Sequence, residues 1–211
     1  MSLYPVSLNL QNRLCLVVGG GKVAERKTKA LLNAGANVRL ISPDATPNLQ
    51  ALAADGSLDW RQAAYAPGGT ETLDGVFLVM ACTDNRAVNA EVVSEAAARQ
   101  LLILCADDPD AGNFVSAAQI TRGDLVLTVS TGGGSPTLAV VLREHLEAEF
   151  GPEWAKLVEM IGKQRDIVKT NPTEAARKEV IRRVLDDPKV HQLLRDGNLL
   201  EAETRIRACL S

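Results

Sequence analysis

The stretch LCLVVGGGKVAERK, residues 14–27, carries the strongest signal in the chain. An apolar run ends in three glycines, and a helical pattern follows to about residue 34. Gly19, Gly21 and Ala24 have the G-x-G-x-x-A spacing of a dinucleotide-binding turn. The first glycine permits the tight turn, the second admits a pyrophosphate, and the third small residue lets the helix pack closely on the strand. The phosphates then lie on the unpaired N–H groups at the helix N-terminus.

A second strand is expected at 37–42, which completes a β-α-β unit; the alternative is a glycine-rich turn in any doubly wound fold. The position that usually carries an acid for the ribose hydroxyls is Ser42, followed by Pro43 and Asp44. The negative charge of Asp44 would repel a 2′-phosphate, whereas the positive charge of Arg39 would attract one. We therefore expect NAD rather than NADP, with Ser42 among the residues that contact the cofactor.

Alternating strands and helices predict an α/β fold with a parallel sheet over the first part of the chain. Strands are expected at 14–18, 37–42, 58–62, 76–82 and 101–105, and helices at 22–34, 46–54 and 85–99.

After residue 110 the pattern changes. A hairpin is expected from strands at 114–120 and 125–130, joined by a turn at 121–124. Ser135 and Pro136 are typical of a helix start, and the helix should run to about Phe150. Its apolar stripe consists of Leu138, Val141, Leu142, His145 and Leu146. Beyond residue 151 the chain is expected to be helical, at 153–169, 173–186, 188–195 and 198–208.

The composition excludes several classes of protein. The 211 residues are 46% apolar and 3% aromatic, and the net charge is −3 without a basic run, so no nucleic-acid surface is expected. No apolar stretch is long enough for a membrane span, and the N-terminus has no signal-like segment. These features predict a cytoplasmic protein. The scattered cysteines read as reduced core residues rather than disulfides or a zinc site; they are Cys15, Cys82, Cys105 and Cys209.

Three places can carry chemistry. Asp107 follows the fifth strand, where open α/β sheets bind ligands, so it is a candidate general base; the alternative is a turn residue before Pro109. Thr83 follows the fourth strand and either touches the cofactor or belongs to the cap of the next helix. The small residues from Ser130 to Pro136 lead into a helix and form a candidate anion site, or a flexible connection. Neither histidine has a partner at ligand spacing, so no protein metal site is expected.

Four motifs together resemble the siroheme synthase family. They are the opening glycine segment, Ala81–Asn85 with Val88 and Asn89, Ala106–Pro109 with Asn113 and Phe114, and Arg122–Leu125 continuing through Ser130–Pro136. The likeness covers about residues 3–165. Members carry precorrin-2 dehydrogenase activity and, in many cases, sirohydrochlorin ferrochelatase activity.

This resemblance implies three parts and an intertwined homodimer with the tetrapyrrole in a cleft between them. The parts are a Rossmann domain (1–112), a dimerisation region (113–150) and a small helical domain (151–211). The family's catalytic aspartate falls on Asp107. Its cofactor contacts fall on Gly19, Gly20, Gly21, Lys22, Val23, Pro43 and Asp44, and near Thr83.

The sequence departs from the family pattern at three places. Cys105 stands where asparagine is common, Gly112 where cysteine is common, and Ser116-Ala117 replace a proline-containing pair. The resemblance implies that these positions touch the cleft wall, so fine substrate contacts are expected to differ from those of the family. The 211 residues also leave no room for the methyltransferase domain of some relatives, so another protein is expected to make precorrin-2.

The expected reaction is NAD-dependent oxidation of precorrin-2 to sirohydrochlorin, with Asp107 as general base. Fe²⁺ as substrate would then replace the inner pyrrole protons in a chelatase step. The substrate carries many carboxylates, so a group of residues that binds them is expected. The candidates are Arg122, Ser130, Thr131, Gly132, Gly133 and Ser135, with Arg143 nearby. The residues leave three alternatives open: a dehydrogenase without chelatase activity, another small NAD-dependent dehydrogenase, and a nucleotide-sensing regulatory module.

Overall fold

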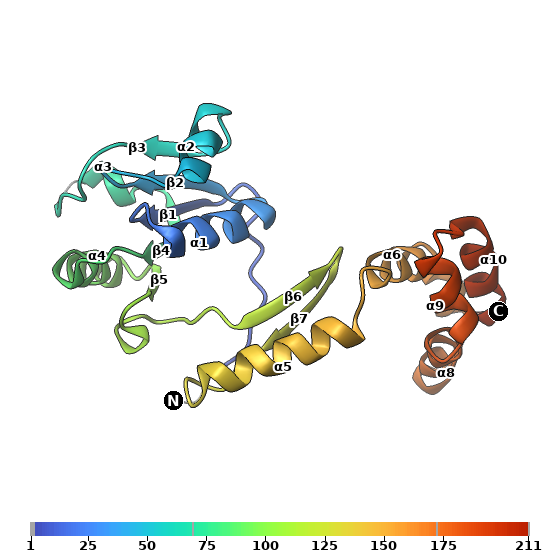
Figure 1. Ribbon diagram of the computed structural model, residues 1–211. Coiled ribbons are helices and arrows are strands. Elements are labelled where there is room, and N and C mark those ends of the chain that lie inside the picture. The colour runs from blue at the N-terminus through green and yellow to red at the C-terminus, as the bar shows by residue number, and fades with distance from the viewer. Residues whose placement is uncertain (1–2, 69, 172, 211) are drawn as a thin grey trace. The chain divides into compact units, whose positions relative to one another are not determined.

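The computed structural model describes residues 3–68, 70–171 and 173–210. These residues form two compact units, one spanning residues 4–116 and the other residues 117–210 together with Leu3. Figure 1 gives the element labels used below. The predicted domain boundaries at 112 and 150 stay predictions.

The first unit is built on a five-stranded parallel sheet with the order β3-β2-β1-β4-β5. This confirms the predicted α/β class. The strands are β1 (Leu14–Val18), β2 (Asn37–Ile41), β3 (Asp59–Arg61), β4 (Val76–Ala81) and β5 (Leu102–Cys105). The helices are α1 (Lys22–Asn33), α2 (Pro47–Ala54), α3 (Thr70–Leu73) and α4 (Arg86–Ala98), with a 3₁₀ turn η1 at Pro109–Ala111. The sequence did not predict the short elements α3 and η1.

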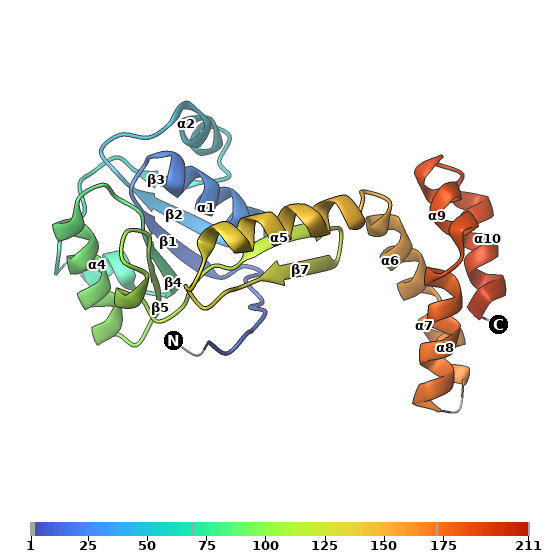
Figure 2. The same ribbon diagram turned by 60° about the horizontal axis from the view of Figure 1, so that its bottom comes forward.

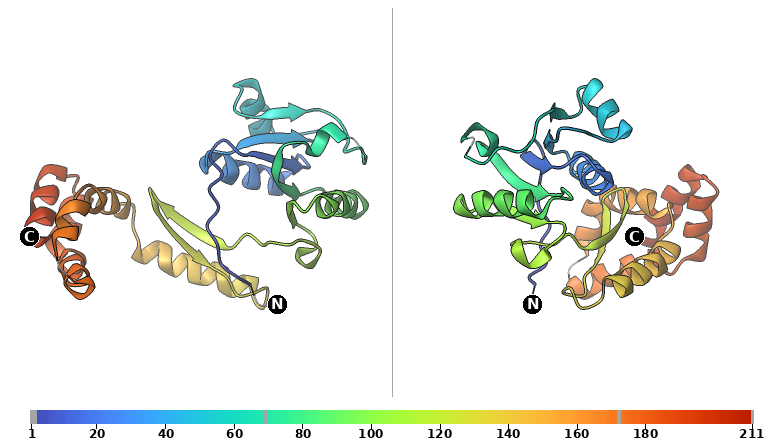
Figure 3. Two further views of the ribbon diagram at one scale, coloured as in Figure 1. Left: turned by 180° about the vertical axis from the view of Figure 1, so that it is seen from behind. Right: turned by 60° about the vertical axis from the view of Figure 1, so that its left-hand side comes forward.

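Both faces of the sheet are buried, as expected for parallel strands that read as continuous apolar runs. On β1, Cys15 and Val17 belong to a core shared with α1 and α2, while Leu16 and Val18 belong to a second core that includes Val92 of α4. The sheet and its flanking helices can be followed from behind in Figure 3.

The strand order reverses direction between β1 and β4. The chain leaves β1 for β2 and β3 on one side, then returns to β4 on the other side of β1. The ends of β1 and β4 are adjacent, because Val18 is in register with Ala81. In open α/β sheets a ligand binds in the crevice at such a switch point. The loops that begin at Gly19 and Cys82 therefore border the expected binding crevice.

The second unit begins with an antiparallel hairpin of β6 (Ala118–Arg122) and β7 (Leu125–Val129). The predicted first strand, 114–120, started too early, because Phe114 packs against the core of the first unit. Asn113 likewise bonds backbone groups of that unit, at Ile103 and Leu101. The turn is also shorter than predicted: Arg122 pairs with Leu125, and Gly123 has a φ of 58°, which suits the first position of a two-residue hairpin loop.

Helix α5 (Pro136–Glu149) follows the hairpin and starts at the predicted cap, since the Ser135 hydroxyl accepts the Leu138 N–H at 3.2 Å. Only part of the predicted apolar stripe faces the protein. Ala139 is buried and Leu146 is half-buried, whereas Leu138, Val141 and Leu142 are 40–49% exposed.

Five further helices pack around their own apolar core in the C-terminal part of this unit (Figure 2). They are α6 (Trp154–Lys163), α7 (Arg165–Thr170), α8 (Glu174–Leu185), α9 (Pro188–Arg195) and α10 (Leu199–Leu210). The helix predicted at 153–169 is two helices, because the chain leaves helical geometry at Gln164, with φ −94° and ψ 14°. Of the helices in the described ranges, none combines the length and the apolar character needed to cross a membrane.

Candidate functional site

The turn after β1 needs glycine at its first position. Gly19 has a φ of 113°, which side chains rarely tolerate. A Cβ atom there would lie 2.6 Å from the Cys82 carbonyl oxygen and 3.0 Å from the Thr83 nitrogen. Gly19 therefore lets the turn after β1 touch the loop after β4 at the switch point.

The second glycine accommodates the loop after β2. A Cβ atom on Gly20 would collide with the backbone carbonyl of Asp44. The Thr46 N–H donates to the Gly20 carbonyl at 3.0 Å, and the Ser42 hydroxyl donates to the Asp44 carbonyl at 2.6 Å. Ser42 is buried, so its hydroxyl shapes this loop; its predicted ribose contact stays a prediction. These bonds hold the Ser42–Thr46 loop directly against the glycine turn.

The third glycine leaves open space at the start of α1. Gly21 is the N-cap residue, has no side chain to cap the helix, and has no atom within 4 Å of the place a Cβ would take. The first N–H groups of a helix have no intrahelical partner. Lys22 and Val23, which begin this helix, are exposed. An uncapped helix start with room above it fits the pyrophosphate of a dinucleotide.

Glu25, for which the sequence predicted no role, connects α1 to the loop after β2. Its carboxylate accepts from the Thr46 hydroxyl and from the Asn48 amide at 2.7 Å each, and from Lys29 at 2.6 Å. Hydrogen bonds from Lys29, Thr46 and Asn48 lower the pKa of Glu25 to about 2. The acid therefore stays ionised and holds the α2 N-terminus beside the glycine turn.

Arg39 is engaged away from this turn. Its Nε lies 2.8 Å from a carboxylate oxygen of Asp59, the residue opposite it on β3. A guanidinium already paired with a carboxylate is a weaker partner for a 2′-phosphate, which leaves Asp44 as the exposed charge in the loop after β2.

Asp107 lies just beyond β5 and is held by two internal donors. Its Oδ1 accepts from the Asn89 amide at 2.7 Å and from the Cys105 thiol at 3.1 Å. The other oxygen, Oδ2, lies 3.7 Å from Nε of the exposed Arg86. The Cys105 hydrogen bond is the main cause that lowers the pKa of Asp107, with Asn89 and Arg86 contributing in the same direction. The carboxylate is therefore ionised at neutral pH, as a general base must be.

Asn89 joins the loops after β4 and β5, and its side chain is almost fully buried on α4. Its amide donates to the Thr83 carbonyl as well as to Asp107, and its oxygen accepts from the Thr83 N–H and hydroxyl. From the sequence, Asn89 had no expected role beyond its place in a motif. A buried asparagine at the N-terminal end of a helix that follows a strand was the available signal.

The buried thiols Cys15 and Cys82 are protonated, because burial raises the pKa of each to about 11. The pKa of Cys105 is also raised, by burial and by its hydrogen bond to Asp107. Within the described ranges no three His, Cys, Asp or Glu side chains gather in a group that could hold a metal ion.

In the second unit, the Ser130–Ser135 loop is largely bonded to itself. The Thr131 hydroxyl donates to the Ser135 carbonyl and accepts the Ser135 N–H, both at 3.1 Å. The Gly132 and Gly134 N–H groups also bond within the loop, to Ser130 and Thr131. The loop is therefore an ordered turn rather than a flexible connection, with fewer open N–H groups than an anion site of this length offers.

The arginines predicted to clamp the substrate have structural partners. Arg122 donates to the Phe150 carbonyl at 2.9 Å and to the Thr121 carbonyl at 3.1 Å. It also lies 3.6 Å from Glu147, which Arg143 contacts through its own guanidinium. These contacts fasten the end of α5 to the hairpin, so the part of Arg122 in substrate binding stays a prediction.

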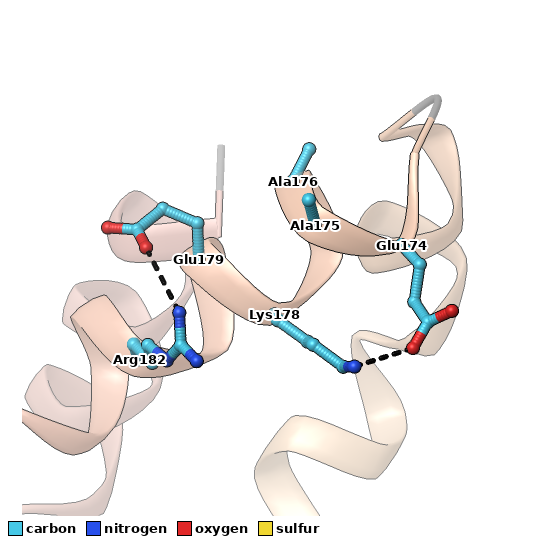
Figure 4. Close-up of a pocket in the computed structure, with 6 residues that line it drawn as sticks. All are labelled: Glu174, Ala175, Ala176, Lys178, Glu179 and Arg182. Atoms are coloured by element: carbon cyan, nitrogen blue, oxygen red, sulfur yellow. Dashed lines mark ion pairs between the residues drawn. The ribbon is translucent and has the colours of Figure 1, made fainter.

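Figure 4 shows a separate depression on α8. It is lined by residues of this helix alone, and two ion pairs cross it, Lys178–Glu174 at 2.6 Å and Arg182–Glu179 at 3.8 Å. Exposed same-helix pairs of this kind are ordinary surface features, and they indicate no chemistry.

Comparisons with known proteins agree with the geometry of the first unit. The family described as "Putative NAD(P)-binding" matches residues 6–118. The siroheme synthase of Xylella fastidiosa is 36% identical over the whole chain, which covers 44% of that protein. The siroheme synthase of Chromobacterium violaceum is also 36% identical, over 99% of this chain and 44% of its own length.

A solved structure extends the likeness. The protein named "SirC, precorrin-2 dehydrogenase" superposes with a TM-score of 0.73 at 28% identity, over 96% of this chain and all of that one. The chain thus spans less than half the length of the siroheme synthases but the full length of this structural relative. The family match covers more than half of the chain, which therefore belongs to this NAD(P)-binding family and resembles siroheme synthases.

Proposed function

We propose that this protein oxidises precorrin-2 to sirohydrochlorin with NAD. The carrying observation is the Asp107 carboxylate, ionised and held beyond β5 in the same unit as the open glycine turn. The names of its relatives, siroheme synthase and precorrin-2 dehydrogenase, support the choice of substrate.

NAD, when bound, accepts a hydride from a macrocycle carbon. The residues of the chain bind the cofactor and accept the proton. Gly19, Gly20 and Gly21 admit the pyrophosphate to the helix start, and Thr83 and Asp44 border the cofactor. Asp107 accepts the proton that leaves with the hydride, so that substrate oxidation gives one hydride to the cofactor and one proton to the carboxylate. A positioned base of this kind is typically worth about 10²–10⁴-fold in rate.

We further propose a chelatase step on the product. Fe²⁺ enters as substrate, the macrocycle supplies four nitrogen ligands, and two inner pyrrole protons leave. Asp107 is the candidate acceptor for one of them, because its low pKa keeps it deprotonated between turnovers. The acidic side chains of the tetrapyrrole are assigned to the loop of Ser130, Thr131, Gly132, Gly133 and Ser135, with Arg122 beside the same hairpin. Binding there would exchange some of the loop's internal hydrogen bonds for bonds to the substrate.

We propose a homodimer formed through the hairpin and α5. A two-stranded sheet is marginally stable alone. Here Val126 on β7 is 52% exposed, and Leu138, Val140, Val141 and Leu142 on α5 are 40–49% exposed. A second copy offers the same apolar residues in return, as a two-fold interface requires.

The deciding experiment incubates the protein with enzymatically prepared precorrin-2 and NAD and follows the absorbance spectrum. Growth of the sirohydrochlorin spectrum together with NADH supports the proposal. Supplying sirohydrochlorin and Fe²⁺ without NAD tests the chelatase step alone. If the protein binds NAD but changes neither tetrapyrrole, the proposal is wrong, and the chain is either a nucleotide-sensing module or a dehydrogenase for another substrate.

A further inference from the structure

The side chain of Asn89 uses its full hydrogen-bonding capacity inside the protein. The residue is 1% exposed. Its two amide hydrogens go to the Thr83 carbonyl at 3.0 Å and Asp107 Oδ1 at 2.7 Å. Its oxygen accepts from the Thr83 N–H at 3.1 Å and the Thr83 hydroxyl at 2.8 Å. A primary amide has two hydrogens to donate and two lone pairs to accept, so each of these positions has a partner within the protein. The single Thr83 hydroxyl hydrogen is shared with the Asn85 carbonyl, at 3.0 Å.

We propose that Asn89 is a positioning residue that orients the Asp107 carboxylate so that Oδ2, and not Oδ1, accepts the substrate proton. The inference rests on the proposed role of Asp107 as general base. It goes beyond that role, because it names the atom that reacts and the residue that selects it.

The two oxygens of Asp107 have different surroundings. Oδ1 is occupied by two donors, Asn89 and the Cys105 thiol. The side-chain partner of Oδ2 is the exposed Arg86, whose Nε lies 3.7 Å away, which is beyond hydrogen-bond distance. An oxygen that already accepts two side-chain hydrogen bonds is a poor proton acceptor, whereas Oδ2 accepts none from the side chains of the described residues and is the more open of the two to a substrate.

Asn89 also fixes where this carboxylate stands. Thr83 lies past β4 and Asp107 past β5, and neighbouring parallel strands end at the same edge of the sheet. One amide binds both loops, so together with the Ala106 N–H bond to the Ala81 carbonyl at 2.9 Å it sets the distance between the loop beside the glycine turn and the base. A misplacement of about 1 Å can cost about 10²-fold in rate, so such a link is significant.

Among the described residues, three charged or titratable side chains from the surrounding elements influence Asp107. Arg86 comes from α4, Cys105 from β5, and Cys82, whose thiol Asp107 influences electrostatically, from the end of β4. Only Arg86 is charged at neutral pH among these partners, since both thiols titrate above their ordinary range. A pH effect that follows a change at Asn89 is therefore assigned to Asp107.

The test compares Asn89→Ala and Asn89→Asp with the unchanged protein. Asn89→Ala removes the donor to Oδ1, so the pKa of Asp107 should rise. Asn89→Asp keeps the acceptor for Thr83 but places a second carboxylate against Oδ1, so the rise should be larger. Carboxyl-carbon NMR titration of Asp107 measures this without substrate. In turnover, kcat should fall by about 10–100-fold, and its acid limb should move to higher pH.

Glu95→Ala is the matched control. Glu95 lies on the same helix and bonds the Tyr65 hydroxyl at 2.6 Å and the Gly68 N–H, so its loss also weakens α4 packing. The control should lower the melting temperature and leave the Asp107 titration and the acid limb unmoved. If Asn89→Ala does not fold, Asn89→Asp, which retains two of the four bonds, carries the test.

An Asp107 titration that is the same in both Asn89 variants and in the unchanged protein overturns the inference. A shifted titration in a protein that never oxidises precorrin-2 leaves the positioning role standing and removes the proposed function. A shift that Glu95→Ala reproduces would mean that α4 packing in general, and not Asn89, sets the carboxylate; this too overturns the inference.

Discussion

The backbone carbonyl oxygen of Asp44 lies where residue 20 would carry its Cβ atom. The glycine turn and the loop after β2 are therefore built against each other, and the Thr46 N–H bond to the Gly20 carbonyl fastens them at 3.0 Å. Any side chain at position 20 must push the two apart. The three glycines consequently have different jobs: Gly19 and Gly20 are needed by the protein, and Gly21 leaves room for a ligand.

Substitutions at these glycines should separate folding from binding. Gly20→Ala should destabilise the protein by about 1–3 kcal/mol, because the methyl group overlaps a backbone atom. Gly21→Asp should fold normally, because nothing lies within 4 Å of the new Cβ and the backbone φ is an ordinary −81°. Its carboxylate should repel the pyrophosphate and weaken NAD binding by about 100-fold or more.

Urea unfolding and calorimetric titration with NAD give the two readouts. Gly21→Ala is the steric control: it adds the Cβ without the charge, so it should lose much less affinity than Gly21→Asp. Unchanged NAD affinity in Gly21→Asp would show that the dinucleotide does not bind at this turn.

Glu25 should make stability depend on pH in a defined direction. Its pKa is lowered from 4.5 to about 2, so the ionised acid stabilises the folded protein above pH 4.5. That contribution is lost as the pH falls from 4.5 towards 2. Glu25→Gln should therefore lower the melting temperature at pH 7, and the difference from the unchanged protein should shrink as the solution is acidified.

Glu159→Gln is the matched control, because the pKa of Glu159 is also lowered to about 2 by hydrogen bonds from Lys156 and Lys163. Those partners are on its own helix, whereas Glu25 joins separate elements through Thr46 and Asn48. The control should change the melting temperature less. An equal effect would mean that Glu25 is an ordinary surface charge.

The cofactor preference follows from the end of β2. Asp44 should disfavour a 2′-phosphate, and Arg39 is held by Asp59 at 2.8 Å. We expect kcat/KM to favour NAD over NADP by about tenfold or more, and Asp44→Ala to reduce that preference. A clear preference for NADP in the unchanged protein would contradict this assignment, because Arg39 or another basic residue would then have to reach the 2′-phosphate.

The sequence predicted what local pattern determines. The β1–α1–β2 unit follows from an apolar run, a glycine turn and helical periodicity, and all of it is present. The cap of α5 at Ser135 follows in the same way. The break between α6 and α7 was missed because Gln164 carries no glycine or proline signal. The start of β6 was misplaced because an apolar residue such as Phe114 suits the core of the first unit as well as a strand of the hairpin. Only tertiary packing decides between the two.

The candidate site shows the same division. Asp107 was found because a position after a strand is a sequence property. Asn89 and Glu25 were not assigned roles, because their partners lie 18 and 21 residues away, at Asp107 and Thr46, in other elements. A hydrogen bond across such separations depends on the register of the sheet, which a single sequence does not display.

The exposed apolar residues of the hairpin and α5 should form the dimer interface. Val126→Asp combined with Val141→Asp should convert a dimer into a monomer, because each places a charge in an apolar contact. Light scattering after size-exclusion chromatography measures the mass. Leu200→Asp is the control, since Leu200 on α10 is 80% exposed and should not alter the mass. A monomeric unchanged protein would contradict the assignment.

Asp107 links both proposed reactions, so its substitution separates them. Asp107→Ala should lower sirohydrochlorin formation by about 10²–10⁴-fold, because it removes the carboxylate that accepts the proton, while NAD affinity stays nearly the same. Asp108→Ala, at the neighbouring exposed acid, is the control and should keep most activity.

Iron insertion into supplied sirohydrochlorin is measured separately. A variant that loses oxidation but keeps insertion confines Asp107 to the first step. If Asp107→Ala keeps near-normal rates in both steps, the residue only shapes the turn before Pro109, and a loss in Asp108→Ala instead would move the base to the next residue.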